Sequence, residues 1–179
     1  MHEFEKHESR NIHKSRESHE SHESHHGEGE GDVIAVRRSA MDLLARREHS
    51  RFELARKLLR RYPPRLVTEA VERLAVEGLQ SDERFAENYV RQRAGRGYGP
   101  ARIQRELQDR GVKNALAEST LAVSGFDWHD IARQALAKKF GGVSAAITMP
   151  EKARMLRFFA YRGFSREHLP EPLGSGPLG

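Results

Sequence analysis

Apolar residues recur at three- and four-residue intervals from Val33 onward, which is the pattern of helices that each bury one face. Glycine, proline and short polar residues interrupt this pattern repeatedly, so we predict a series of short helices rather than strands or one long helix. The expected buried positions of the first three helices are Val36, Ala40, Leu43 and Leu44, then Leu54 and Leu58, then Leu66, Ala70 and Leu74.

Local signals mark the expected helix ends. Ser50 with Glu53, and Thr148 with Glu151, have the spacing of a capping box. Pro100 stands where the first residue of a helix tolerates a missing N–H. Further expected ends are an N-terminal cap at Asp127 and glycines at Gly78, Gly95, Gly111, Gly141 and Gly163.

Buried positions of the second helix in each group of three recur at an offset of 49 residues and then of 52. Such spacing is typical of stacked helical repeats. The aligned pairs are Leu54 and Leu58, Ile103 and Leu107, and Met155 and Phe159.

We therefore predict an all-α protein of three consecutive three-helix units between two disordered ends. The N-terminal end is rich in Ser, His and Glu, and the C-terminal sequence LPEPLGSGPLG is rich in Gly and Pro. The predicted boundaries are 1–32 for the disordered N-terminal tail, 33–79, 80–125 and 126–169 for the three units, and 170–179 for the disordered C-terminal tail.

Charge is divided unevenly along the chain. The net charge is +5, but residues 1–31 hold four Lys/Arg against eight Asp/Glu, a charge of −4, so that the remaining residues carry +9. A strongly basic helical body favours nucleic acid or an acidic protein surface as the partner. The alternative is that these charges only solvate the helix faces.

Composition excludes several classes of function. The chain has no cysteine, which excludes disulfides, thiol catalysis and Cys-ligated zinc. No apolar run is long enough to span a membrane and the N-terminus lacks a signal-peptide core, so we expect a cytoplasmic protein. The stretch RAGRGYG follows a helix and lacks the Lys-Ser/Thr ending of a phosphate loop. We therefore expect neither an enzyme nor a cofactor, and we interpret the H-E-x-x-H match at residues 22–26 as accidental, without a metal site.

Arginine is the residue type that the body offers to a partner. Seven arginines between Arg84 and Arg110 stand against only three acidic residues, and Arg102 and Arg105 are expected to point away from the buried Ile103 and Leu107. Tyr98 is expected either to stack on a base or to cover a helix junction. The predicted binding residues are Arg46, Arg47, Arg56, Lys57, Arg91, Arg93, Arg96, Tyr98, Gly99, Arg102 and Arg105.

The chain resembles the RecX family, the regulators of the RecA recombinase, in four stretches that appear in the family's order. They read LLARREHSRFELARKLLRR, DERFAENYVRQRAGRGYGPARIQRELQDRGV, FDWHDIARQALAKKFGG and EKARMLRFFAYRGFSREHL, and together extend from about Ala40 to Leu169. The resemblance implies three tandem three-helix repeats in an elongated, curved molecule that needs no cofactor. The Ser/His/Glu tail departs from the family pattern.

The resemblance also implies a function in recombination, DNA repair and the SOS response. The expected protein is a monomer that binds in the groove of the RecA–DNA filament and suppresses ATP hydrolysis and strand exchange. Arg91, Arg93, Arg96, Arg102 and Arg105 are then expected to face the filament, while Tyr98 and Gly99 fix the turn. Two alternatives remain: a helical module that binds single- or double-stranded DNA directly, with a steep salt dependence, and a scaffold whose arginines only solvate it.

Overall fold

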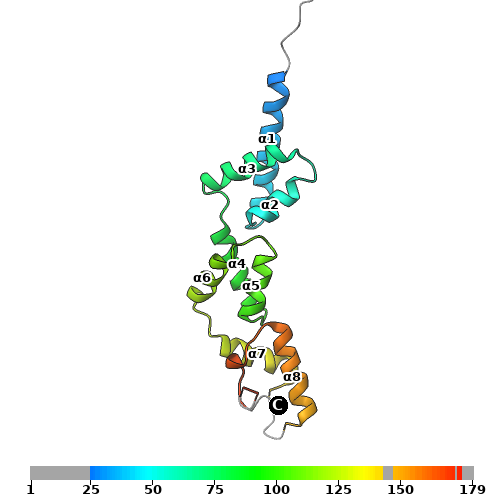
Figure 1. The fold of residues 1–179 in the computed structure, drawn as a ribbon, viewed down its shortest axis with the longest axis vertical. Helices are drawn as coiled ribbons and strands as arrows, with labels where there is room; N and C mark the ends of the chain where they lie inside the picture. Colours follow the sequence, from blue (N-terminus) through cyan, green and yellow to red (C-terminus); the bar gives the residue numbers. More distant parts are fainter. Residues whose placement is uncertain (1–24, 143–146, 172, 175–179) are drawn as a thin grey trace, which may run out of the picture.

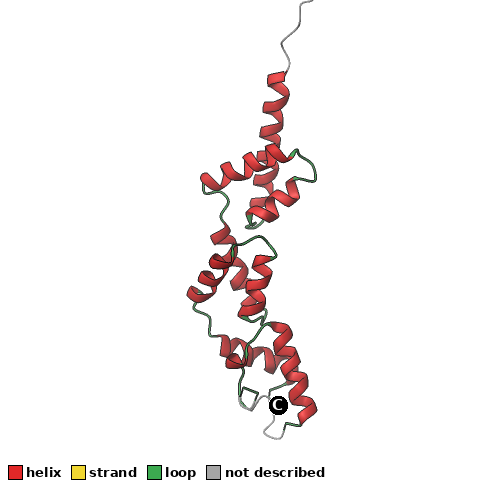
Figure 2. Cartoon of the chain, in the orientation of Figure 1, coloured by secondary structure: helices red, strands yellow, loops and turns green. Residues whose placement is uncertain are grey.

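The computed structural model describes residues 25–142, 147–171 and 173–174. The described residues form eight α-helices and one short 3-10 helix, with no strand (Figure 2). Figure 1 shows the helices in three groups that follow one another along the long axis of the molecule. The predicted all-α fold of tandem helical units in an elongated molecule is confirmed.

The first unit contains α1 (His25–Leu44), α2 (Arg51–Leu58) and α3 (Pro64–Val76). Its core joins apolar residues of all three helices, and Leu43 and Leu44 pack at its edge. The buried members are Val36, Ala40, Leu54, Leu58, Leu66, Val67, Ala70, Val71 and Leu74. Every position that the apolar pattern assigned to this core therefore contributes to it.

The second unit contains α4 (Asp82–Ala94), α5 (Pro100–Gln108) and α6 (Asn114–Val123). Its core consists of Phe85, Ala86, Val90, Ala94, Ile103, Leu107, Val112 and Ala117.

The third unit contains α7 (Trp128–Phe140), α8 (Met149–Arg162) and η1 (Arg166–His168), so that its last element is a single 3-10 turn. Its core consists of Ala132, Leu136, Met155, Phe159, Phe164, Leu169 and Leu173. Trp128 is the first residue of α7, but its ring packs against the core of the second unit. The tryptophan therefore connects units two and three.

The repeat found in the sequence corresponds to α2, α5 and α8. The aligned residues of these helices, from Leu54 to Phe159, are all buried, with at most 9% of their surface exposed. Each second helix thus presents the same two positions to the core of its own unit.

The predicted caps form with one difference. Thr148 and Glu151 make a complete capping box, whereas at α2 only the hydroxyl of Ser50 takes part, by accepting from the N–H of Glu53. The carboxylate of Glu53 instead pairs with Arg47 and Arg110. The box is incomplete because two guanidinium groups offer this carboxylate stronger, charged donors than a backbone N–H.

Both ends of the ordered body extend beyond the expected boundaries. The helix α1 begins at His25, so residues 25–32, which we assigned to the disordered tail, are helical. Apolar periodicity misses this start because residues 25–31 carry no apolar residue. At the other end Leu173 is buried in the third core and its N–H donates to the carbonyl oxygen of Pro170, so the expectation of disorder from residue 170 is wrong for 170, 171, 173 and 174. The remaining tail residues, and the side chains of the H-E-x-x-H match, lie outside the described part of the chain.

Candidate interaction surface

The Gly-Tyr-Gly-Pro turn before α5 lies at the joint between units two and three. The N–H of Gly99 donates to the carbonyl oxygen of Arg162 at 2.8 Å, and the N–H of Ala101 donates to that of Gly163 at 3.2 Å. Gly99 is buried, and a Cβ added to it would lie 2.4 Å from the carbonyl oxygen of Gly163. Only a residue without a side chain allows this backbone contact.

Tyr98 covers the same joint. Its ring is half-buried and lies under three guanidinium groups, whose carbons are 3.7 Å (Arg93), 4.9 Å (Arg102) and 4.6 Å (Arg162) from the ring centroid. Arg162 comes from unit three, and its Nη1 donates to the carbonyl oxygens of Arg96 and Gly97. Cation–π stacking therefore holds Tyr98 between the units, which supports its role as a cover of the junction.

Glu106 is the acidic centre of this arginine cluster. Its carboxylate accepts hydrogen bonds from Arg93, Arg102 and the hydroxyl of Tyr89. Burial alone would raise its pKa, but the donors Arg102, Arg93 and Tyr89 outweigh burial and hold the pKa of Glu106 below its ordinary value of 4.5. Burial, together with the hydrogen bond to Glu106, raises the pKa of Tyr89 to about 12.

Arg102 is turned toward unit three, which contradicts the expectation that it points outward. Only 26% of its side chain is exposed, and its Nη1 donates to the carbonyl oxygen of Tyr161 at 2.8 Å. Its guanidinium also lies 4.5 Å from the centroid of the Tyr161 ring. The pattern within one unit shows which face the core of that unit buries, but not which face the next unit covers.

The first joint, between units one and two, uses side chains that bond to the backbone. The hydroxyl of Ser50 donates to the carbonyl oxygen of Arg110 at 2.6 Å, and the amide of Gln80 donates to that of His49 at 3.1 Å. The apolar pattern of the sequence gives no sign of either Gln80 or His49, yet both are almost fully buried. Burial lowers the pKa of His49, so its neutral form is favoured here.

The eleven predicted binding residues separate into two groups. Arg93, Tyr98, Gly99 and Arg102 are buried or half-buried and form the second joint. The other seven are exposed, and of these Arg47 pairs with Glu53, Arg91 donates to Asn88 and Arg56 lies over the Phe52 ring. The exposed group consists of Arg46, Arg47, Arg56, Lys57, Arg91, Arg96 and Arg105.

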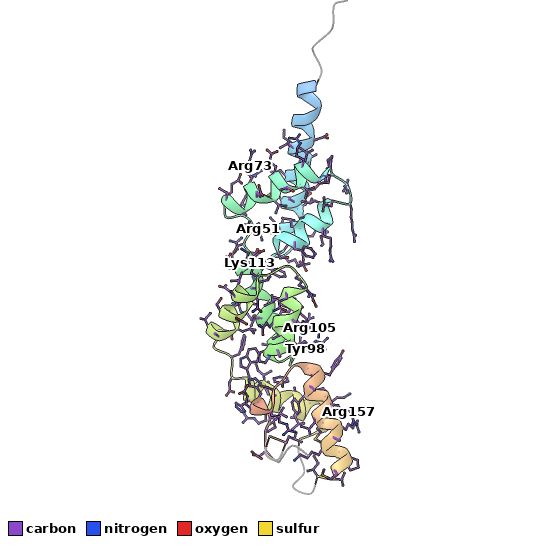
Figure 3. All side chains as sticks on the ribbon, in the orientation of Figure 1. Arg51, Arg73, Tyr98, Arg105, Lys113 and Arg157 are labelled. Carbon is purple, nitrogen blue, oxygen red and sulfur yellow. The ribbon has the colours of Figure 1, made fainter. Side chains whose placement is uncertain are left out.

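One exposed arginine recurs in every unit. The offsets that align the buried residues also align Arg56 of α2, Arg105 of α5 and Arg157 of α8, and all three side chains are exposed. Figure 3 shows Arg105 and Arg157 on the same side of the molecule, and Arg73 on the other. Sequence reasoning missed Arg157, although the repeat offset of 52 residues was sufficient to find it.

Other kinds of site find no support in the described part of the chain. Its His, Asp and Glu side chains make no group of three that could hold a metal ion. None of its helices is long and apolar enough to cross a membrane.

Comparison with known protein families gives two matches inside the chain. Residues 37–74 match the first three-helix domain of RecX, and residues 81–121 match its second three-helix domain. These ranges correspond to units one and two.

Curated relatives extend the similarity over most of the chain. The regulatory protein RecX of Pseudomonas savastanoi pv. phaseolicola is 48% identical over 132 residues, which cover 73% of this chain and 84% of the relative. The regulatory protein RecX of Pseudomonas entomophila is 47% identical over 146 residues, which cover 81% of this chain and 94% of the relative.

Solved structures share the fold at low sequence identity. The crystal structure of RecX from Lactobacillus salivarius superposes with a TM-score of 0.63 at 22% identity, over 78% of this chain and 92% of that one. A second crystal structure, of a regulatory protein RecX, has a TM-score of 0.67 at 16% identity, over 79% of this chain and 72% of that one.

Proposed function

The chain belongs to the RecX family of regulatory proteins, and from this premise we propose that it is a negative regulator of the RecA recombinase. In this proposal the protein binds the RecA–DNA filament as a cytoplasmic monomer and suppresses ATP hydrolysis and strand exchange during recombination and DNA repair. It needs no cofactor and catalyses no reaction of its own.

The observation that carries the proposal is the recurrence of one exposed arginine in each of three consecutive units. Arg56, Arg105 and Arg157 occupy equivalent positions on α2, α5 and α8, and the chain is elongated along the axis that joins the units (Figure 1). A filament repeats its own surface along its length, so several weak, regularly placed contacts add up to firm binding. Arginine suits such contacts because its planar fork pairs with carboxylates and phosphates.

Regularly placed contacts also require a fixed spacing between the units, and the two joints provide this spacing. At the second joint the backbone bonds of Gly99 and Ala101 and the stacked Tyr98 link units two and three. At the first joint Ser50 and Gln80 link units one and two. Units held by such bonds lose less freedom on binding than units on flexible linkers, so more of the contact energy appears as affinity.

The direct test is the single-stranded-DNA-dependent ATPase rate of RecA, with the chain added from substoichiometric to equimolar amounts. A second form should begin at residue 25, where α1 starts, because this truncation removes the tail and leaves every described helix intact. We expect both forms to reduce the ATPase rate. Unchanged rates with both forms would refute the proposal, and inhibition by the full chain alone would assign the activity to the tail.

Direct binding to DNA is the second candidate, favoured by the charge of +9 on residues 32–179. It predicts binding to bare oligonucleotides that weakens steeply with salt, with a slope set by the number of phosphates contacted. A filament-directed protein instead keeps inhibiting RecA at salt concentrations where binding to bare DNA is lost. Measuring both quantities over the same salt series separates the two candidates.

A further inference from the structure

A groove of about 670 Å³ lies between the turn that precedes α5 and the exposed face of α7. One wall is the segment from Ala94 to Gly97, and the other is formed by α7 from Asp130 to Lys139. Its volume lies in the range of roughly 300–1,000 Å³ that is usual for ligand sites. Arg162, which donates to the carbonyl oxygens of Arg96 and Gly97 at the second joint, also belongs to the lining of the groove.

The floor of the groove is apolar. Ala94 and Ala135 are buried, and Phe126 and Ile131 are half-buried. At its inner end a Cβ on Gly97 would stand 3.2 Å from the Cβ of Ala135, so the turn and α7 are already in close contact there. An occupant can therefore bury one or two apolar side chains against this floor without rearranging the units.

The rim carries cations that have no side-chain partner among the described residues. The exposed side chains of Arg96, Lys138 and Lys139 line the groove, and within the described residues none of them makes a hydrogen bond or an ion pair. The acidic residues of the lining are already engaged: Asp127 caps α7 by accepting from the N–H of Asp130, and the Asp130 carboxylate accepts from Arg133 and Gln134. The lining thus combines an apolar floor with four cationic side chains, Arg162 included, against two carboxylates, so that its net charge is positive.

We propose that this groove binds an acidic peptide segment of a protein partner. An apolar side chain of the segment packs on Ile131 and Ala135, and its carboxylates pair with Arg96, Lys138 and Lys139. This inference rests on the proposed function for the identity of the partner, the protein component of the RecA–DNA filament, and it adds a contact separate from the arginines of α2, α5 and α8.

The lining favours a peptide over a nucleic-acid strand. Stacking of unpaired bases needs an exposed aromatic face, whereas Phe126 is the only aromatic residue of the lining and its half-buried ring packs beside Trp128. Asp127 and Asp130 border one side of the groove. A strand carries a phosphate at every nucleotide and would bring some of them against these carboxylates, whereas a peptide can place its acidic side chains beside the cations and its uncharged backbone beside Asp127 and Asp130.

Site-directed crosslinking tests this proposal, because the chain has no cysteine of its own. Gln134→Cys places a single thiol in the lining of the groove, where a benzophenone maleimide is attached. Thr68→Cys, on an exposed position of α3 in unit one, is the matched control. Both labelled proteins are mixed with RecA filaments on single-stranded DNA and illuminated, and the crosslinked peptides are identified by mass spectrometry.

We expect the label at residue 134 to crosslink to an acidic segment of RecA, and the label at residue 68 not to reach that segment. Adding Lys138→Glu and Lys139→Glu should reduce this crosslink at least tenfold while the helical circular dichroism is unchanged, since both side chains are exposed and pair with no other described residue. A crosslink to DNA or to a segment without acidic residues would overturn the proposal, as would a yield that the two charge reversals leave intact.

Co-sedimentation of the same samples separates the two proposals. If the unlabelled chain does not sediment with RecA filaments, the proposed function itself fails. If it sediments and inhibits the ATPase but residue 134 yields no crosslink to an acidic segment, only the groove assignment fails.

Discussion

Gly99 and Gly163 lie in backbone contact across the joint between units two and three, with no room for a side chain on either of them. A Cβ on Gly99 would stand 2.4 Å from the carbonyl oxygen of Gly163, and a Cβ on Gly163 would stand 2.4 Å from the backbone nitrogen of Arg102. This contact brings the start of α5 to the end of α8. The glycines of the turn thus serve the assembly of the units.

Gly99→Ala should lower the free energy of unfolding by roughly 1–3 kcal/mol, because the atom that it adds meets backbone that cannot rotate away. Its φ of −85° suits any residue, so the cost is steric. Gly95→Ala is the matched control: it lies in the same turn at a φ of −62°, and its Cβ would make an ordinary contact at 3.4 Å. Urea unfolding, followed by the fluorescence of Trp128 beside this joint, should separate the two variants. Equal losses would contradict the backbone contact.

Gly111→Ala should be more costly than Gly125→Ala. Both glycines have positive φ, +78° and +67°, where an L residue is strained, but only at Gly111 would a Cβ also meet a neighbour, at 2.4 Å from the Cβ of Phe52. We expect about 1 kcal/mol for the backbone strain alone at Gly125, and a larger loss at Gly111. Urea unfolding of both variants measures the difference, and its absence would mean that units one and two do not meet through Phe52.

Leu107→Ala should destabilise the protein by roughly 2–5 kcal/mol, because its side chain is fully buried in the core of the second unit. Leu59→Ala, at the end of α2 with 48% of its surface exposed, is the control and should cost less than about 0.5 kcal/mol. Urea denaturation at neutral pH gives both values. A loss at Leu107 as small as that at Leu59 would mean that α5 turns a different face to its core.

Acid should weaken the second joint through Glu106. The folded state holds the pKa of Glu106 below 4.5, so its carboxylate contributes stability above that pH and loses it as the pH falls through the lowered value. Glu106→Gln removes this contribution. The variant should therefore be less stable than the wild type at neutral pH, and the two should converge as the pH falls well below 4.5. Urea unfolding over a pH series measures this, and a constant difference at every pH would contradict the assignment.

The units themselves could be predicted from the sequence, because each core depends on residues a few positions apart. Leu54, Ile103 and Met155 occur at repeat offsets, and caps such as Thr148 with Glu151 are local. The joints could not be predicted, since they depend on contacts between residues about 60 positions apart, such as Gly99 with Arg162. Arg102 shows the consequence: the pattern of its own helix assigns it to solvent, whereas the neighbouring unit covers it.

An arginine of the second joint, such as Arg102, and an exposed arginine, such as Arg105, should respond differently to charge reversal. Arg105→Glu should weaken inhibition of the RecA ATPase at least several-fold without changing stability, because its side chain is exposed and has no partner within the described residues. Arg102→Glu should instead destabilise the joint, since it replaces a donor to Glu106 and Tyr161 with a second acid. Arg73→Glu controls for net charge, because Arg73 lies on the opposite side of the molecule in Figure 3.

Each variant is compared by the concentration that halves the ATPase rate and by the urea midpoint. If Arg105→Glu and Arg73→Glu inhibit equally well, the side of the molecule that carries Arg105 and Arg157 does not face the filament. If Arg105→Glu loses stability as Arg102→Glu does, Arg105 belongs to the joint. Loss of inhibition at an unchanged urea midpoint for Arg105→Glu alone is the result that assigns this surface to the partner.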